Sequence, residues 1–157
     1  MRTGILIDTN KTYPMTPSEI FAFGNTFVLL GWILLLVLPA WRHTQTIVLN
    51  GVVLILATVY TFLIVRDLGN FSLESFSTLE NVKALFQHDA AVAAGWFHYL
   101  AFDLLVGAYI VKKARKLNIS RWIYTLILPF TFMFGPVGYL LFVLVKIIKT
   151  KGISEDV

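Results

Sequence analysis

Four long apolar segments, each bounded by polar or charged residues, constrain what this chain can fold into. They cover residues 18–40, 46–65, 89–111 and 121–146. An α-helix rises about 1.5 Å per residue, so about 20 residues cross the roughly 30 Å hydrocarbon core of a bilayer. The chain is 57% hydrophobic and 14% charged, whereas soluble domains average about 45–50% and about 25%. The sequence therefore predicts an all-α integral membrane protein, a four-transmembrane-helix bundle that forms a single membrane domain over 1–157.

The segments outside the apolar runs are short. Residues 1–15 are predicted to form a polar arm, and two capping boxes, Thr16–Glu19 and Ser77–Glu80, indicate helix starts. Residues 77–87 place apolar side chains at helical spacing but are too few to cross a bilayer. We therefore predict a short amphipathic helix at the membrane interface between helices two and three. An ordered loop is the alternative for this segment.

The charged residues lie mostly at the ends of the apolar runs, where cations anchor and orient membrane helices. The net charge of +4 therefore indicates membrane anchoring, and no nucleic-acid partner is predicted. An even number of spans places both termini on one side of the membrane. The dense cations from Lys112 to Arg121, between helices three and four, favour termini on the outside. The chain has no cysteine, which excludes disulfides and thiolate chemistry.

Helix three carries most of the polar side chains within the apolar runs. Trp96, His98, Tyr99 and Asp103 all lie inside this predicted span. An ionised carboxylate at the centre of a bilayer costs roughly 2.5–3.5 kcal/mol on insertion scales, so Asp103 is expected to have a partner, a water-filled cavity or a proton. On a helical wheel these four side chains and Phe102 share one face, and aliphatic residues occupy the other. Because intramembrane ionisable residues mark functional sites by default, this face is the candidate site.

A structural role is the alternative for His98 and Asp103. Their sole role would then be to hold the bundle together. They would do so by hydrogen-bonding to Asn50 or Tyr60 of helix two, or to a carbonyl freed by a kink in helix four. Helix four contains an internal proline and the sequence Gly-Pro-Val-Gly at 135–138, which predict kinks that face protein or a cavity. The histidines lie in separate regions without paired-ligand spacing, so no metal and no cofactor is predicted.

The stretch from Gly95 to Leu104 reads Gly-Trp-Phe-His-Tyr-Leu-Ala-Phe-Asp-Leu, and Phe-Gly-Pro-Val-Gly follows at 134–138. This pattern resembles the abscisic-acid-deficiency-four-like family, over roughly residues 20–150. Plant members of that family are plastid membrane proteins required for making neoxanthin from violaxanthin. The chain does not begin with a long extension of the transit-peptide kind, so it looks more like a bacterial member. The resemblance then implies the bacterial inner (cytoplasmic) membrane.

The resemblance implies an isomerisation in which an epoxide opens and a vinylic proton leaves, giving an allene and a tertiary alcohol. Such a reaction needs an acid at the epoxide oxygen and a base at the carbon-bound proton, but no redox cofactor. The implied catalytic residues are Asp103, kept protonated by burial, as the acid and His98 as the base, or the reverse, with Tyr99 assisting. Trp96 and Phe102 would stack on the polyene. The predicted substrate-binding residues are Trp96, Phe102, Asn50, Tyr60 and Pro136.

A non-catalytic membrane module is the rival hypothesis. With the same helix face it would bind a carotenoid or another isoprenoid, or stabilise a partner enzyme or a homo-oligomer. The lipid bilayer is the surrounding partner under both hypotheses. Pigments extracted from the purified protein would discriminate between them, because an altered carotenoid indicates catalysis and an unaltered one indicates binding.

Overall fold

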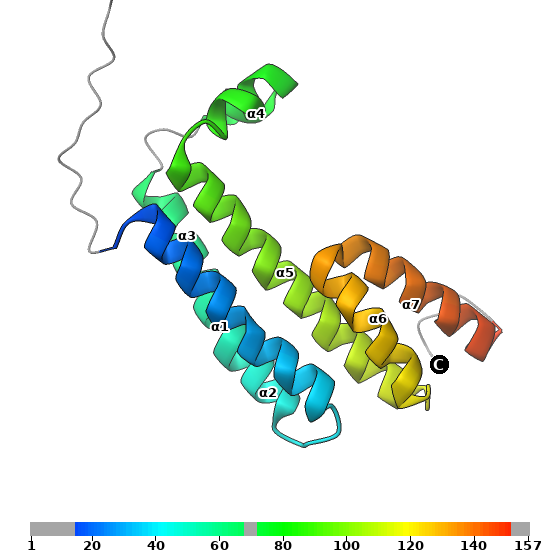
Figure 1. The fold of residues 1–157 in the computed structure, drawn as a ribbon. Helices are drawn as coiled ribbons and strands as arrows, with labels where there is room; N and C mark the ends of the chain where they lie inside the picture. Colours follow the sequence, from blue (N-terminus) through cyan, green and yellow to red (C-terminus); the bar gives the residue numbers. More distant parts are fainter. Residues whose placement is uncertain (1–14, 68–71, 152–157) are drawn as a thin grey trace, which may run out of the picture.

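A computed structural model describes residues 15–67 and 72–151, and these residues form helices and turns without a β-strand. Nearly all of the predicted polar arm, 1–15, lies outside the described residues. Figure 1 shows the arrangement of the helices. The elements are α1 (Pro17–Val37), α2 (Thr44–Ile47), the π-helix η1 (Val48–Val53), α3 (Leu54–Arg66), the 3-10 helix η3 (Leu73–Phe76), α4 (Leu79–Leu85), α5 (Asp89–Lys116), α6 (Arg121–Met133) and α7 (Gly135–Thr150).

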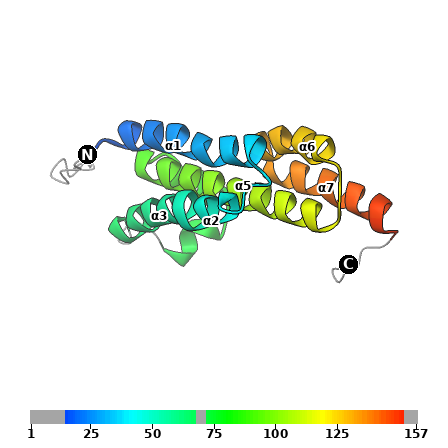
Figure 2. The same cartoon turned by 90° about the horizontal axis from the view of Figure 1, so that it is seen from below.

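Within the described residues, three helices are long and apolar enough to cross a membrane. They are Pro17–Val37, the continuous helix Thr44–Arg66 made by α2, η1 and α3, and Asp89–Lys116. Half of the apolar window of α5 is buried, against 28% for each of the other two. The helix α5 is therefore central, and it packs against α1, α3, α6 and α7 (Figures 1 and 2).

The fourth predicted span, 121–146, is not one kinked helix in the structure. The helix α6 ends at Met133 and α7 begins at Gly135, while Phe134 between them has φ −149° and ψ 64°, outside the helical region. The two helices pack against each other as a hairpin (Figure 1). With 13 and 16 residues, they are about 20 and about 24 Å long, shorter than the roughly 30 Å hydrocarbon core. The described residues therefore contain three helices of crossing length and one short hairpin, and the structure does not confirm the predicted fourth crossing.

Contacts along α5 show which way the hairpin returns. Asp103 lies against Gly135 at the start of α7, and the Tyr109 ring lies 6.1 Å from the rings of both Tyr139 and Phe142. The helix α7 therefore runs beside the second half of α5 and in the same direction. Its end reaches the level of the turn between α5 and α6, where Lys149 and residues 118–120 line one cleft.

A close backbone approach explains why the chain folds back at this point. A Cβ atom added at Gly138 would overlap the Cα and side chain of Thr131 in α6, so the glycine lets the two helices touch. Pro136 cannot continue α6 without losing a backbone hydrogen bond, but it suits the first turn of a new helix, where it is found. The two residues together favour a break over a kink.

We expect Gly138→Ala to destabilise the hairpin by about 1–3 kcal/mol, the usual cost of overfilling a packed site. Thermal unfolding in detergent measures this change as a lower midpoint. Gly51→Ala is the matched control, because the nearest atom to its added Cβ is the Ile47 side chain at 3.9 Å, an ordinary contact. Equal midpoints for the two variants would show that α6 and α7 do not need this close approach.

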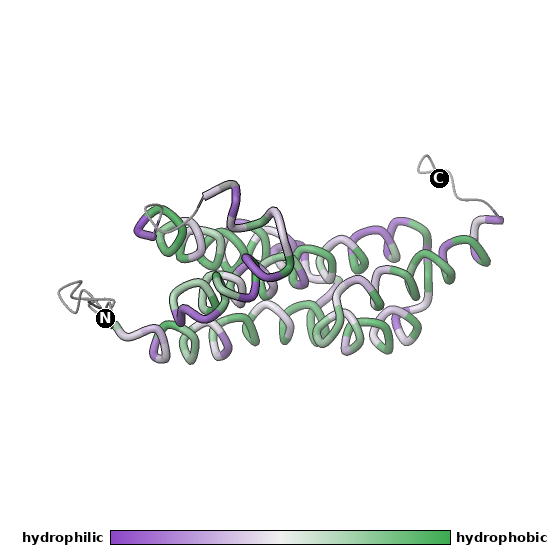
Figure 3. The backbone as a smooth tube through the Cα atoms, turned by 90° about the horizontal axis from the view of Figure 1, so that it is seen from above, coloured by the Kyte–Doolittle hydropathy of each residue, from purple (hydrophilic) through white to green (hydrophobic). Residues whose placement is uncertain are grey.

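The segment 77–87, predicted as an amphipathic helix, contains α4, which projects from the top of the bundle (Figure 1). Its cap differs from the prediction: the side chain of Thr78 accepts a hydrogen bond of 3.2 Å from the backbone of Asn81, in place of a capping box at Ser77–Glu80. The capping box at Thr16–Glu19 is confirmed. Figure 3 shows hydrophilic residues gathered in this projecting region and near helix ends, with hydrophobic residues along the helices between them.

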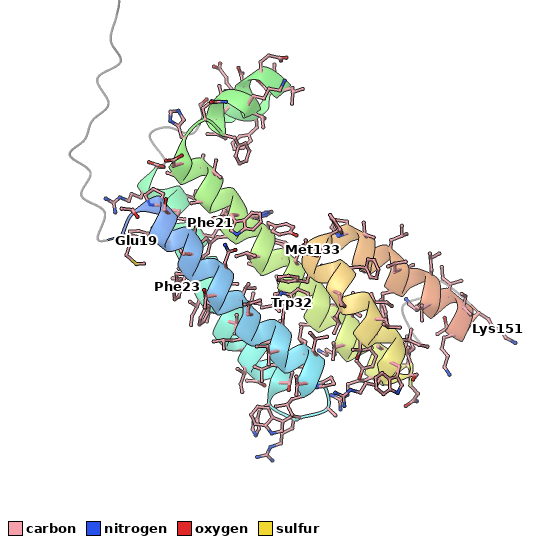
Figure 4. All side chains as sticks on the ribbon, in the orientation of Figure 1. Glu19, Phe21, Phe23, Trp32, Met133 and Lys151 are labelled. Carbon is pink, nitrogen blue, oxygen red and sulfur yellow. The ribbon has the colours of Figure 1, made fainter. Side chains whose placement is uncertain are left out.

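The two ends of the bundle carry opposite charge. Figure 4 places Glu19 at one end and Lys151 at the other. Among the described residues, the Glu19 end holds two cations, Arg66 and Lys83. It also holds five carboxylates, namely Glu19, Asp67, Glu74, Glu80 and Asp89. The Lys151 end holds nine cations and, within the same described ranges, no carboxylate: Arg42, Lys112, Lys113, Arg115, Lys116, Arg121, Lys146, Lys149 and Lys151. Within the described chain, α1 begins and α7 ends at opposite ends of the bundle, so the structure does not support the expected placement of both termini on one side.

Candidate functional site

The polar face of α5 meets a different neighbour at each turn of the helix. The first contact is with α1, where the indole Nε1 of Trp96 donates a hydrogen bond of 2.7 Å to the Asn25 side-chain oxygen. The Trp96 ring also lies 5.2 Å from the ring of Phe21 and 5.2 Å from that of Tyr99. Trp96 thus connects α1 to the middle of α5.

Tyr99 satisfies the open end of α6. Its hydroxyl donates to the Met133 carbonyl oxygen at 2.6 Å, and the Phe132 carbonyl oxygen lies 3.2 Å away. The last carbonyls of a helix lack donors from their own helix. Within a bilayer no water replaces those donors, so a side chain from a neighbouring helix has to do so.

Asp103 satisfies the open start of α7. Its carboxylate accepts a hydrogen bond from the backbone N–H of Gly135, the first residue of that helix. A negative charge or acceptor is favoured there, because the first N–H groups of a helix are unpaired and its dipole is positive at this end. Gly135 is required for the contact, since a Cβ at this position would overlap the carboxylate.

One oxygen of Asp103 remains without a partner. The side chain is 6% exposed, and its Oδ2 makes no hydrogen bond with any described residue. The Tyr99 hydroxyl lies next to this carboxyl group. We call Tyr99, Asp103 and the adjoining backbone at 132–135 the tip site, because they meet where the α6–α7 hairpin turns, near the middle of the 28-residue α5.

The structure does not bring His98 to the tip site. His98 and Phe102 are both exposed, with ring centres 4.5 Å apart, and the Tyr60 ring lies 5.5 Å from His98 on the side of α3. His98 and Tyr60 line a separate pocket of about 200 Å³, together with Phe86 near α4. The predicted polar face is therefore divided between two places.

The remaining predicted residues are also placed by the structure. Asn50 is exposed within η1, and Pro136 is exposed one residue after Gly135, beside the tip site. Asn25 was not predicted, because helix one looks like a uniform apolar wall in the sequence. A single amide in this apolar run was the only signal, and it carries no information about its partner on α5.

An apolar groove on the surface of the bundle adjoins the tip site at Phe132. It has a volume of about 250 Å³ and lies between α1 and α6. Phe132 links the two features, since its side chain lines the groove and its carbonyl faces the Tyr99 hydroxyl. Figure 4 labels Trp32 and Met133 in this region. The residues that line the groove are Leu29, Trp32, Ile33, Leu36, Leu128, Pro129 and Phe132.

The tip site offers general acid or base chemistry and hydrogen bonding next to an apolar groove. In the described part of the chain, no three His, Cys, Asp or Glu side chains lie close enough to hold a metal ion. The titratable groups at the site are therefore one carboxyl and one phenol, which can move a proton or orient a ligand oxygen.

Comparison with known proteins agrees with the sequence motif in α5. A search of the curated proteins found no match, and a search of the solved structures found none either. A family model described as ABA DEFICIENT 4-like matches residues 19–142. The match covers most of the chain and includes Asn25, Trp96, Tyr99, Asp103 and Gly135. The chain belongs to the ABA DEFICIENT 4-like family, as the motif from Gly95 to Leu104 predicted.

Proposed function

We propose that this protein takes a carotenoid from the surrounding bilayer and isomerises an epoxide at its end, with Asp103 as the acid. The unpartnered Oδ2 of Asp103 carries the proposal, because a buried carboxyl oxygen without a protein partner can act on a ligand. Family membership supports the proposal through the carotenoid epoxide chemistry that the sequence resemblance implies. We place the protein in the inner membrane of a bacterium.

The groove between α1 and α6 suits a long apolar ligand. Ligand pockets are mostly apolar with a few polar groups that fix orientation, and here the polar groups of the tip site lie at one end. Leu29 and Ile33 are 43% and 55% exposed on the lipid-facing side, so a ligand dissolved in the bilayer can enter sideways. A polyene along the groove would bring its end group toward Tyr99 and Asp103.

In the proposed reaction, Asp103 donates its proton to the epoxide oxygen and the carbon–oxygen bond breaks. The neighbouring vinylic proton then leaves, so that an allene and a tertiary alcohol form and no electrons are gained or lost. The nearest base is the carboxylate that Asp103 has become, with Tyr99 beside it. His98, the base first inferred from the sequence, faces α3, so we assign it no proton transfer.

A non-catalytic role remains the second candidate because one observation favours it. Tyr99 and Asp103 already hydrogen-bond the two open helix ends of the hairpin, and this role alone accounts for two polar side chains inside a membrane. Under this candidate, the protein would bind a carotenoid or another isoprenoid in the same groove and leave it unaltered.

Pigments extracted from the protein test both candidates. The protein is purified from a host that makes an epoxide carotenoid, and its pigments are separated by chromatography and identified by mass. We expect an allenic isomer with the mass of the epoxide. An unaltered epoxide would support binding alone, and the absence of any pigment would overturn both candidates.

A groove variant locates the bound pigment. Ile33→Trp fills the groove and is expected to lower the pigment bound per chain several-fold. Leu30→Trp is the matched control, since Leu30 lies on the same helix with 53% exposure, against 55% for Ile33, but does not line the groove. Equal pigment in the two variants would place the ligand elsewhere.

A further inference from the structure

A second cleft lies at the basic end of the bundle, between the α5–α6 turn and the end of α7. Its volume is about 580 Å³. Asn118, Ser120 and Lys149 supply its polar groups, and Ile123, Val145 and Ile148 supply apolar wall. This cleft is separate from the groove and from the tip site.

The polar residues of the cleft lie at the open end of the hairpin, and its apolar residues lie deeper along α6 and α7. Ser120 precedes α6 and Lys149 lies at the end of α7, so both sit at the open end of the hairpin. Ile123 and Val145 lie one turn deeper on the same two helices, toward the tip that reaches mid-depth. A ligand that fits this arrangement has a polar head at the membrane surface and an apolar chain directed into the bilayer.

The charge around the cleft selects an anionic head. The nine cations at the Lys151 end have no carboxylate among the described residues near them. Several of these cations are engaged elsewhere. Arg115 donates to the Pro39 carbonyl at 2.9 Å, Arg121 donates to the Leu36 carbonyl at 3.1 Å, and Arg42 donates to the His43 ring at 2.7 Å. Lys149 is the exposed cation that lines the cleft itself.

We propose that this cleft binds an anionic phospholipid of the leaflet that faces the basic end. Its phosphate would lie between the Lys149 ammonium and the Ser120 hydroxyl, and one acyl chain would follow Ile123 and Val145. A free soluble anion would leave the apolar wall uncovered, and a zwitterionic lipid would gain little from the excess positive charge. The bound lipid would hold α6 and α7 together at the open end of the hairpin, as Tyr99 and Asp103 do at the tip.

Tryptophan quenching tests the proposal with the whole protein in vesicles. Trp122 is 78% exposed and adjoins Ile123 of the cleft, so brominated acyl chains bound there should quench its fluorescence. Brominated phosphatidylglycerol is compared with brominated phosphatidylcholine at equal mole fraction in phosphatidylcholine vesicles. Trp122→Phe protein gives the signal of the other tryptophans, which is subtracted. We expect stronger quenching by the anionic lipid, and equal quenching by the two lipids would overturn the proposal.

A matched pair of charge variants separates a built site from diffuse attraction. Lys149→Gln is expected to lower the preference for phosphatidylglycerol several-fold, because Lys149 is the cation that lines the cleft. Lys112→Gln removes the same charge from an exposed residue at the same end that does not line the cleft, and it should retain the preference. An equal loss in both variants would contradict a specific site. Circular dichroism confirms that both variants are folded.

Discussion

Asp103→Asn is expected to lower isomer formation by at least about 10²-fold, within the usual 10²–10⁴-fold contribution of a general acid or base. Asparagine retains an oxygen that can accept the hydrogen bond from Gly135, so the hairpin tip is kept. It cannot donate and recover a proton, so the proposed chemistry is lost. The allenic product formed per milligram of protein in carotenoid-fed membranes measures the effect, and the thermal midpoint in detergent confirms the fold.

His98→Gln is the companion variant, since it alters another polar residue of α5 that faces α3. We expect it to form product at close to the rate of the unaltered protein. Full activity in Asp103→Asn would show that Asp103 only caps α7 and that the protein binds without catalysis at this residue. Loss of activity in His98→Gln with an intact fold would restore the proton transfer first inferred from the sequence.

Single cysteines at the two ends of the bundle are expected to react from opposite sides of the membrane. The chain has no cysteine of its own, so each introduced thiol is the only one present. Because the hairpin returns α7 to the basic end, Lys151→Cys should react from the cytoplasmic side, where cations gather in short loops. Ser77→Cys, between η3 and α4, should react from the outside. An impermeant thiol reagent applied to intact cells and to inverted vesicles measures both.

Lys116→Cys provides the internal reference, because it lies at the end of α5 whatever path α6 and α7 take. We expect Lys116→Cys and Lys151→Cys to share one labelling pattern. If residues 121–146 crossed the membrane as one helix, Lys151→Cys would instead share the pattern of Ser77→Cys. The experiment therefore distinguishes the short hairpin from the fourth span that the sequence predicted.

The sequence predicted the long helices well because hydropathy and caps are local signals. The Thr16–Glu19 capping box occurs as predicted, and Asn118, just beyond the end of α5, has the left-handed φ of 51° typical of a helix end. Hydropathy could not distinguish a kinked span from a hairpin within 121–146, since both bury the same apolar residues in lipid. The difference depends on Gly138 touching Thr131 and on partners that α5 supplies.

The site was predictable only in part for the same reason. The helical wheel grouped Trp96, Tyr99 and Asp103, and the structure uses all three on the side of α1 and the hairpin. The wheel also included His98, because angular position on one helix does not reveal where a neighbouring helix begins or ends. The break at Phe134 directs Asp103 to a backbone N–H, while His98 packs against Tyr60. Contacts between residues of different helices, such as these two, arise only when the helices pack together, so the pattern along one helix does not predict them.

The hairpin tip has a consequence for the order in which the chain assembles. Neither α6 nor α7 has the length of a stable independent span, and α5 supplies hydrogen-bond partners at the hairpin tip, Tyr99 to the Met133 carbonyl and Asp103 to the Gly135 N–H. We therefore expect α5 to be inserted first and to serve as the template on which the hairpin enters the bilayer. Synthesis from the N-terminus supplies α5 before the hairpin. Tyr99 and Asp103 are therefore in place before the helix ends that they hydrogen-bond are made.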